Sequence, residues 1–148
     1  MSKRPPKTVA LNHDGHSAAY VGRTTAGRQF FLTTPFVPKM GADEGHEFIA
    51  LYVFDKAGVL VSATIDDLGP RETMDETART LRRDAMLASL GKVKYQRIKV
   101  SPFRIEMFGV EFGFLAEPYD DGTGYNVTVE PGDYMSFDAP WDSGDYDT

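Results

Sequence analysis

The sequence predicts an α+β fold: a largely antiparallel sheet of successive hairpins with one main amphipathic helix at about residues 74–90. Three observations predict it. Segments of alternating apolar and polar residues come in neighbouring pairs, joined by short turns rich in Gly, Pro and Asp. A single segment repeats its apolar residues at helical spacing. Expected strands lie before and after this helix, and their short connections favour antiparallel pairing.

Two hairpins are expected before the helix, after a short strand at residues 8–11. The first turn ends in Gly27, and glycine readily supplies the positive φ of a hairpin turn. The second turn is Lys56-Ala-Gly58. Both faces of residues 47–55 are apolar, which predicts a central strand covered on both sides. The expected strand pairs are residues 18–23 with 29–34, and residues 47–55 with 59–67.

The helix is expected to begin at the capping box Thr73-x-x-Glu76, whose side chains bond to free N–H groups of the first turn. Gly91 is expected to end it. Apolar residues spaced by four and three positions form one stripe, which we expect to face the sheet. Burial of Leu81 would contribute about 1.5–3 kcal/mol, so Leu81→Asp is predicted to unfold much of the domain. The stripe consists of Met74, Ala78, Leu81, Ala85 and Ala88.

The chain after the helix returns to strands. The alternation changes phase between Gln96 and Arg97, which predicts a β-bulge, and Gly109 marks a turn. Residues 1–6 are expected to be a flexible basic tail. No linker or internal repeat interrupts the rest of the chain, so residues 7–148 are expected to be a single domain. Strands are expected at residues 92–100, 103–107, 110–116, 125–130 and 133–137.

Charge is divided along the chain, whose net charge is −6. Residues 117–148 form an acidic, aromatic C-terminal segment without Lys or Arg, whereas residues 79–104 are basic and contain one acid, Asp84. Such blocks steer charged partners, although they can equally face each other or be solvated. The acidic residues are Glu117, Asp120, Asp121, Glu130, Asp133, Asp138, Asp142, Asp145 and Asp147.

No motif predicts an enzyme or a cofactor. The absence of cysteine excludes disulfides, Cys-ligated metal centres and thiol nucleophiles. The chain has no Gly-x-Ser-x-Gly elbow, phosphate-binding loop or dinucleotide fingerprint. His13, His16 and His46 lie in expected loops and, with a pocket against the sheet, could form a small-ligand or metal site. A loop does not force such histidines to converge, so no metal ligand is assigned.

The acidic, aromatic end is the first candidate for a binding site. Tyr and Trp are frequent anchors of protein interfaces, and carboxylates around them suit a basic partner surface. We therefore expect a non-enzymatic interaction or regulatory protein that binds another protein with a basic surface. Trp141 can also fold back on its own domain while the acids stay displayed. The candidate partner-binding residues are Trp141, Asp142, Asp145, Tyr146 and Asp147.

Nucleic-acid binding is the alternative that the basic block suggests, because phosphate contacts need such residues. The acidity of the whole chain and the absence of a helix-turn-helix count against it. Met86, Leu87 and Leu90 lie on the arginine side of the helix, where the next strand covers them or a partner binds. The candidate nucleic-acid-binding residues are Arg79, Arg82, Arg83, Lys92, Lys94, Arg97 and Lys99.

Three short segments carry a resemblance: Val-Ser-Pro-Phe-Arg-Ile at residues 100–105, Phe-Gly-Val-Glu-Phe-Gly at 108–113 and Pro-Trp-Asp-Ser-Gly-Asp-Tyr-Asp-Thr at 140–148. They resemble a group of small uncharacterised bacterial proteins, some of which carry the label formate hydrogenlyase regulatory protein. The resemblance implies a bacterial cytosolic regulator without catalytic residues and transfers no site residue. The sequence shows no signal peptide and no long apolar run, so a cytoplasmic protein without membrane contact is expected.

Overall fold

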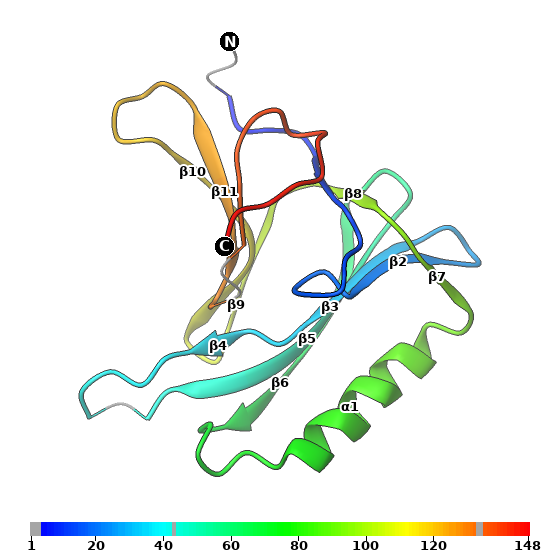
Figure 1. Ribbon diagram of the computed structural model, residues 1–148, viewed down its shortest axis with the longest axis vertical. Helices are drawn as coiled ribbons and strands as arrows, with labels where there is room; N and C mark the ends of the chain where they lie inside the picture. Colours follow the sequence, from blue (N-terminus) through cyan, green and yellow to red (C-terminus); the bar gives the residue numbers. More distant parts are fainter. Residues whose placement is uncertain (1–3, 43, 133–134) are drawn as a thin grey trace.

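The computed structural model describes residues 4–42, 44–132 and 135–148 and confirms the α+β fold with its largely antiparallel sheets. The helix α1 (Glu76–Ser89) lies against one face of a six-stranded sheet, and a four-stranded sheet packs against the other face (Figure 1). A further two-stranded sheet joins the N-terminal strand to the chain after the helix.

The centre of the six-stranded sheet is β5. It pairs with β6 along one side and with β3 and β4 along the other. β2 follows β3, and β7 forms the far edge. Both predicted hairpins before the helix are confirmed, with Gly27 at a φ of 86° in the first turn. The six strands are β2 (Tyr20–Thr24), β3 (Gln29–Thr33), β4 (Phe36–Val37), β5 (His46–Phe54), β6 (Leu60–Gly69) and β7 (Val93–Tyr95).

The four-stranded sheet is built from the chain after the helix, in the order β12-β11-β10-β9. The predicted turn at Gly109 and the predicted hairpin of β11 and β12 are both present. Residues 133 and 134 of that hairpin, like residues 1–3 of the expected tail, lie outside the described residues. The strands are β9 (Phe103–Met107), β10 (Val110–Pro118), β11 (Tyr125–Glu130) and β12 (Met135–Phe137).

The predicted β-bulge after the helix was wrong. The phase change at Gln96 and Arg97 separates two strands that belong to different sheets. β7 pairs with β2, whereas β8 (Ile98–Val100) pairs with β1 (Val9–Leu11). The chain leaves one sheet and enters the other at this point, so the faces of the two strands need not be in phase.

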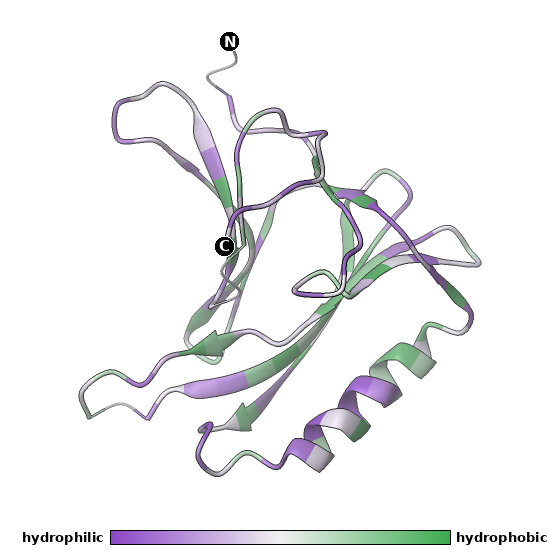
Figure 2. Cartoon of the chain, in the orientation of Figure 1, coloured by the Kyte–Doolittle hydropathy of each residue, from purple (hydrophilic) through white to green (hydrophobic). Residues whose placement is uncertain are grey.

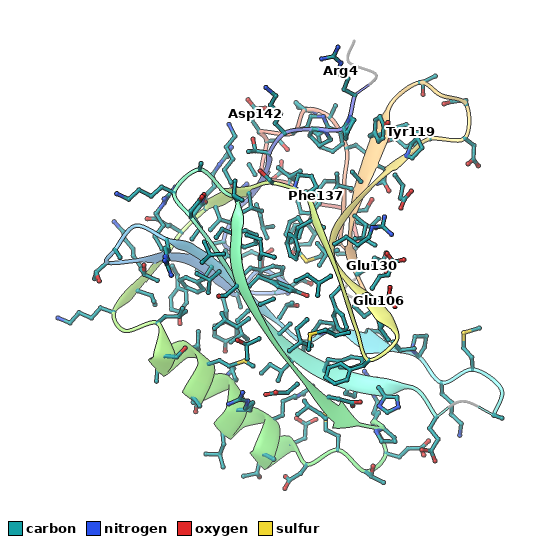
Figure 3. The ribbon with its side chains drawn as sticks, turned by 180° about the vertical axis from the view of Figure 1, so that it is seen from behind. Arg4, Glu106, Tyr119, Glu130, Phe137 and Asp142 are labelled. Carbon is teal, nitrogen blue, oxygen red and sulfur yellow. The ribbon has the colours of Figure 1, made fainter. Side chains whose placement is uncertain are left out.

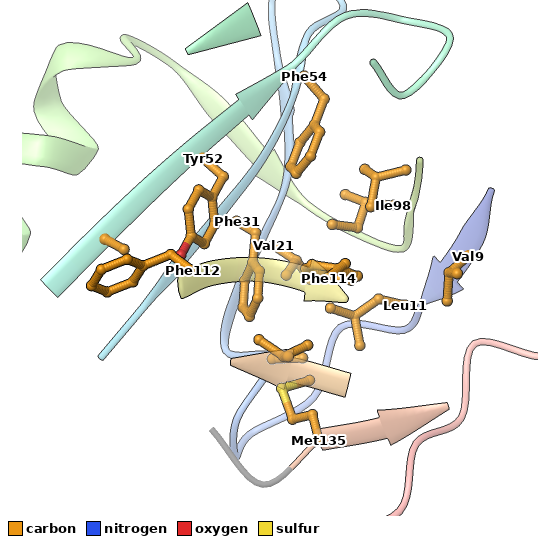
Figure 4. Packing of buried hydrophobic residues seen from close by; sticks show 14 of the residues in the cluster. Val9, Leu11, Val21, Phe31, Tyr52, Phe54, Ile98, Phe112, Phe114 and Met135 are labelled. Carbon is orange, nitrogen blue, oxygen red and sulfur yellow. The ribbon is translucent and has the colours of Figure 1, made fainter. Parts of the chain in front are cut away.

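The two faces of β5 build the two parts of the core, as the apolar pattern of residues 47–55 predicted. Ile49, Leu51 and Val53 face α1 in the smaller cluster. Phe48, Ala50, Tyr52 and Phe54 belong to the larger cluster, which lies toward the four-stranded sheet. Figure 4 shows Tyr52 and Phe54 there, with Phe112 and Phe114 of β10. Aromatic rings hold the two sheets together across this interface: the ring centroids of Tyr52 and Phe103 lie 4.9 Å apart, and those of Phe48 and Phe112 lie 5.0 Å apart.

The helix begins two residues later than predicted. Its N-cap is Asp75 rather than Thr73, because the Asp75 carboxylate accepts hydrogen bonds from the N–H groups of Thr77 at 2.9 Å and Ala78 at 3.3 Å. Gly91, at a φ of 71°, ends the helix as predicted and donates to the Ala88 carbonyl. Among the described residues, no helix is both long and apolar enough to cross a membrane.

The predicted helix face was also wrong. Leu81 is 66% exposed, and Ala78, Ala85 and Ala88 are exposed with it, so Leu81→Asp is no longer expected to unfold the domain. Met86 is buried against the sheet instead, with Leu87 and Leu90 packed beside it. The hydrophobic last turn of α1 is visible in Figure 2. The apolar pattern of the sequence indicated the wrong face because the side of α1 that faces the sheet also carries arginines. Long side chains of this kind bury their methylene groups and keep their charged ends in solvent.

Candidate functional site

A pocket lies between α1, the loop before β2 and the six-stranded sheet. Its volume is about 560 Å³, which lies in the range of small-molecule sites, roughly 300–1,000 Å³. Leu32 and Ile49 supply an apolar floor from neighbouring strands. His16, in the loop before β2, and Tyr20, the first residue of β2, form another part of its wall. We call this concavity the α1 pocket.

Three arginines line the α1 pocket. Arg79 and Arg83 are four residues apart on α1, a spacing that places both on the same face of a helix. Arg71 comes from the turn between β6 and α1. A guanidinium carries five N–H donors and stays charged at every physiological pH, so these groups can bind an anion in the pocket.

Aromatic rings hold two of these guanidiniums in place. The Arg83 guanidinium carbon lies 5.6 Å from the centre of the Tyr20 ring, and that of Arg71 lies 5.3 Å from the centre of the Phe36 ring. Both distances are within the range of a cation–π contact. Such contacts use the faces of the guanidinium and leave its edge, which carries the N–H donors, for hydrogen bonding.

Carboxylates complete the lining. Glu47 is buried, with 6% of its surface exposed, and its carboxylate accepts from Arg71 at 3.1 Å. Glu76 pairs with Arg79 at 2.7 Å. A buried carboxylate needs such a partner, because an uncompensated charge in the interior is costly. Arg83 donates to the Asp84 carboxylate at 3.2 Å, so each of the three arginines has a carboxylate partner. One carboxylate engages only part of the five donors of a guanidinium, so Arg71, Arg79 and Arg83 retain capacity for a second anionic group.

The three histidines do not converge on one site. His16 lines the α1 pocket, where its backbone N–H donates to Asp14 at 2.8 Å. His13 stacks on Tyr95, with ring centroids 5.7 Å apart. His46 Nδ1 lies 2.9 Å from Asp67. Within the described ranges, no group of three His, Asp or Glu side chains is arranged to hold a metal ion.

Asp14 links the loop of the α1 pocket to the C-terminal end of the chain. Its carboxylate accepts from the backbone N–H groups of His16 and Ala18 and from the Tyr146 hydroxyl. Burial alone would raise the pKa of Asp14, but these hydrogen bonds outweigh it and lower the pKa. Burial, followed by the bond to Asp14, raises the pKa of Tyr146. The pair therefore stays an ionised carboxylate and a neutral phenol at neutral pH.

Residues 138–148, the last part of the acidic region and called the C-terminal segment from here on, are fixed to the domain by their backbone. Trp141 O accepts from Ala10 N–H at 2.9 Å, and Gly144 O accepts from Asn12 N–H at 3.0 Å. Asp147 exchanges two backbone hydrogen bonds with Ser136, at 2.8 and 2.9 Å. The segment thus runs along β1 and then β12.

The predicted partner-binding residues divide into two groups on this segment. Trp141 and Tyr146 pack against the larger core cluster. Asp142, Asp145 and Asp147 are exposed, and Figure 3 shows Asp142 at the outer surface while Phe137 lies inside. The aromatic residues therefore hold the segment in place, and the carboxylates are displayed to solvent.

The seven basic residues considered for nucleic acid lie in different surroundings. Arg79 and Arg83 line the α1 pocket, whereas Arg82 pairs with Asp66 of β6. Arg97 donates to main-chain carbonyls of the C-terminal segment, those of Asp142 and Ser143. Lys92, Lys94 and Lys99 are exposed on or beside the short strands β7 and β8.

Sequence reasoning missed three contributors to the α1 pocket, namely Tyr20, Glu47 and Arg71. No local motif marks them, because strand register brings them together: Glu47 lies opposite Gly69 on β6 and opposite Phe36 on β4. The one available signal was a charged residue, Glu47, at the start of an otherwise apolar strand.

Comparisons with known proteins found no relative of this chain. No family model, no curated protein and no solved structure matches it.

Proposed function

We propose that this chain is a binding protein whose α1 pocket takes a small organic anion by its carboxylate or phosphate group. The observation that carries the proposal is the convergence of Arg71, Arg79 and Arg83 on one cavity of about 560 Å³ in a chain of net charge −6. Guanidinium groups match the geometry of carboxylates and phosphates, which they bind through paired N–H donors.

The two ends of such a ligand would have different surroundings. The anionic group meets Arg79 and Arg83 along the helix wall, while an apolar part rests on Leu32 and Ile49. The aromatic contacts of Arg71 and Arg83 orient their guanidiniums before the ligand arrives, which reduces the entropy lost on binding. An apolar floor with a few convergent polar groups is the usual composition of a small-molecule site.

Isothermal titration calorimetry with pyrophosphate and with citrate, used as probes of the group that the arginines bind, tests the anion-binding part of this proposal. We expect saturable binding of at least one of the two anions by the wild-type protein. Arg83→Gln and Arg79→Gln should each weaken it about tenfold or more, because a hydrogen bond to a charged group contributes about 1.5–3 kcal/mol.

Arg82→Gln is the matched control. Arg82 belongs to the same helix and carries the same charge, but it pairs with Asp66 outside the α1 pocket. Its removal should leave the affinity within about twofold, since only long-range charge is lost. Equal losses of affinity for Arg82→Gln and Arg83→Gln would show that the anion responds to the overall charge of the helix. That result would refute binding in the α1 pocket.

The acidic C-terminal segment supports a second candidate, a regulatory function in the bacterial cytoplasm through a protein with a basic surface. The supporting observation is that Asp142, Asp145 and Asp147 are exposed on a segment fixed by backbone hydrogen bonds. A surface fixed in this way loses little conformational freedom when a partner binds.

Affinity copurification from bacterial lysate at low salt tests the second candidate. We expect the wild-type protein to retain a partner after nuclease treatment, and the triple Asp→Asn variant at residues 142, 145 and 147 to lose it. Recovery of nucleic acid alone, reduced by alanine at Lys92 and Lys94, would favour the nucleic-acid alternative instead. A partner retained equally by the triple variant would rule out these carboxylates as the docking surface.

A further inference from the structure

The two edges of the six-stranded sheet differ in how they are protected. At one edge, β7 is three residues long, carries Lys94 and follows Lys92 directly. Short strands and lysines are the usual means by which proteins keep an edge from pairing with another chain. At the other edge, β6 is ten residues long.

The β6 edge has none of these protections along most of its length. β6 pairs with β5 on one side, and no strand of the described chain pairs with its other side. Residues 57–65 contain no charged residue and no proline. Val59 is 54% exposed and Val61 is 46% exposed. Ser62 and Thr64 follow them before the charged end of the strand; Ser62 is exposed and Thr64 is exposed too. A long uncharged edge of this kind is a template for a further strand.

We propose that β6 pairs with β6 of a second copy of this chain, antiparallel and across a twofold axis. The distribution of charge on the strand favours a copy of itself as the partner. Lys56 precedes the uncharged stretch, and Asp66 and Asp67 follow it. Antiparallel pairing places Lys56 of each copy near the aspartates of the other, so the same strand supplies both complementary surfaces.

The adjoining side of α1 is consistent with this arrangement. The ion pair of Arg82 with Asp66 places that side of the helix next to β6. Leu81, which is 66% exposed, precedes Arg82 directly on this helix. Pairing through β6 would continue the sheet across the twofold axis and place both helices on the same face of it. An exposed leucine on each helix would then border the new interface.

The absence of cysteine from the chain allows a direct test by single-cysteine cross-linking. A twofold axis brings a residue near the centre of the edge opposite its own copy, within reach of a disulfide. Under mild oxidation we expect at least one of Val61→Cys, Ser62→Cys and Ala63→Cys to give a covalent dimer. Ala42→Cys, in the exposed loop between β4 and β5, should not. Cross-linking no more efficient than that of Ala42→Cys in all three variants would refute the pairing.

Sedimentation of the unmodified chain gives an independent measurement. We expect the wild-type protein to sediment with twice the chain mass of 16.4 kDa, and Ser62→Lys to sediment as a monomer, since it places two like charges at the axis. Ala42→Lys adds the same charge away from β6 and should leave the dimer intact. A monomeric wild-type protein, or a Ser62→Lys variant that remains dimeric, would overturn the inference.

Discussion

At the scale of single residues, the contact of Arg71 with Glu47 stabilises one part of the α1 pocket lining. Glu47 is 7% exposed at its side chain, whereas Arg71 is 71% exposed, so the arginine serves as the solvent-side partner of a buried charge. Removing the arginine leaves that charge without its partner. Arg71→Ala should therefore lower the free energy of unfolding by about 1–3 kcal/mol, as measured by urea denaturation.

Glu47→Gln in the Arg71→Ala background supplies the control for that prediction. The double variant has no buried charge to compensate, so it should recover most of the lost stability. A double variant as unstable as the sum of its single variants would show that the two residues do not interact.

The pKa of Asp14 makes a second residue-scale prediction. Because this pKa is lower in the folded chain than the value of about 3.9 for an unfolded chain, ionised Asp14 stabilises the fold above that pH. The stabilisation is lost as the pH falls below about 3.9. Asp14→Asn should therefore lose less stability than the wild-type protein between about pH 6 and pH 3, measured by urea unfolding at each pH. Asp142→Asn, at an exposed carboxylate, is the control and should follow the wild-type curve.

At the scale of the element, α1 shows why the face of a helix is harder to predict than its existence. Met86 is 3% exposed, whereas Leu81 is 66% exposed. Met86→Ala should therefore cost about 2–5 kcal/mol of unfolding free energy, and Leu81→Ala about 0.5 kcal/mol or less. Thermal and urea unfolding of the two variants measure the difference. The reverse order would place the predicted apolar stripe against the sheet after all.

The strands were predictable because their pattern is local. Alternation and turn residues located β2, β3, β5 and β6 to within a few residues, and the apolar faces of β5 correctly indicated cover on both sides. The α1 pocket was not predictable in the same way. Arg79 and Arg83 were noticed in the sequence, but Arg71 and Glu47 were not. These two residues are 24 positions apart in the sequence, and the register of β5 with β6 brings them together.

At the scale of the whole molecule, the C-terminal segment joins the outer sheet to the loop of the α1 pocket. Trp141 and Gly144 accept hydrogen bonds from β1 and from Asn12 beside it, and Tyr146 donates to Asp14 in the pocket loop. Deleting residues 141–148 would leave those N–H groups without their partners and uncover part of the larger core cluster. We expect the truncated chain to lose about 3 kcal/mol or more of unfolding free energy in urea, from four backbone hydrogen bonds, two of them between Asp147 and Ser136, and two half-buried aromatic side chains.

The same truncation should reach the α1 pocket through Asp14. Without the Tyr146 hydroxyl, the Asp14 carboxylate loses one of the donors that fix it, and the His16 wall becomes less ordered. Tyr146→Phe isolates this effect, because it keeps the ring packed on the core and removes only the hydroxyl. The affinity for pyrophosphate or citrate should fall several-fold in Tyr146→Phe, because the variant lacks about one hydrogen bond that positions the pocket loop. The Asp→Asn triple variant at residues 142, 145 and 147 keeps the hydroxyl and should change the affinity less. If Tyr146→Phe binds the anion as the wild-type protein does, the C-terminal segment stabilises the fold but does not shape the pocket.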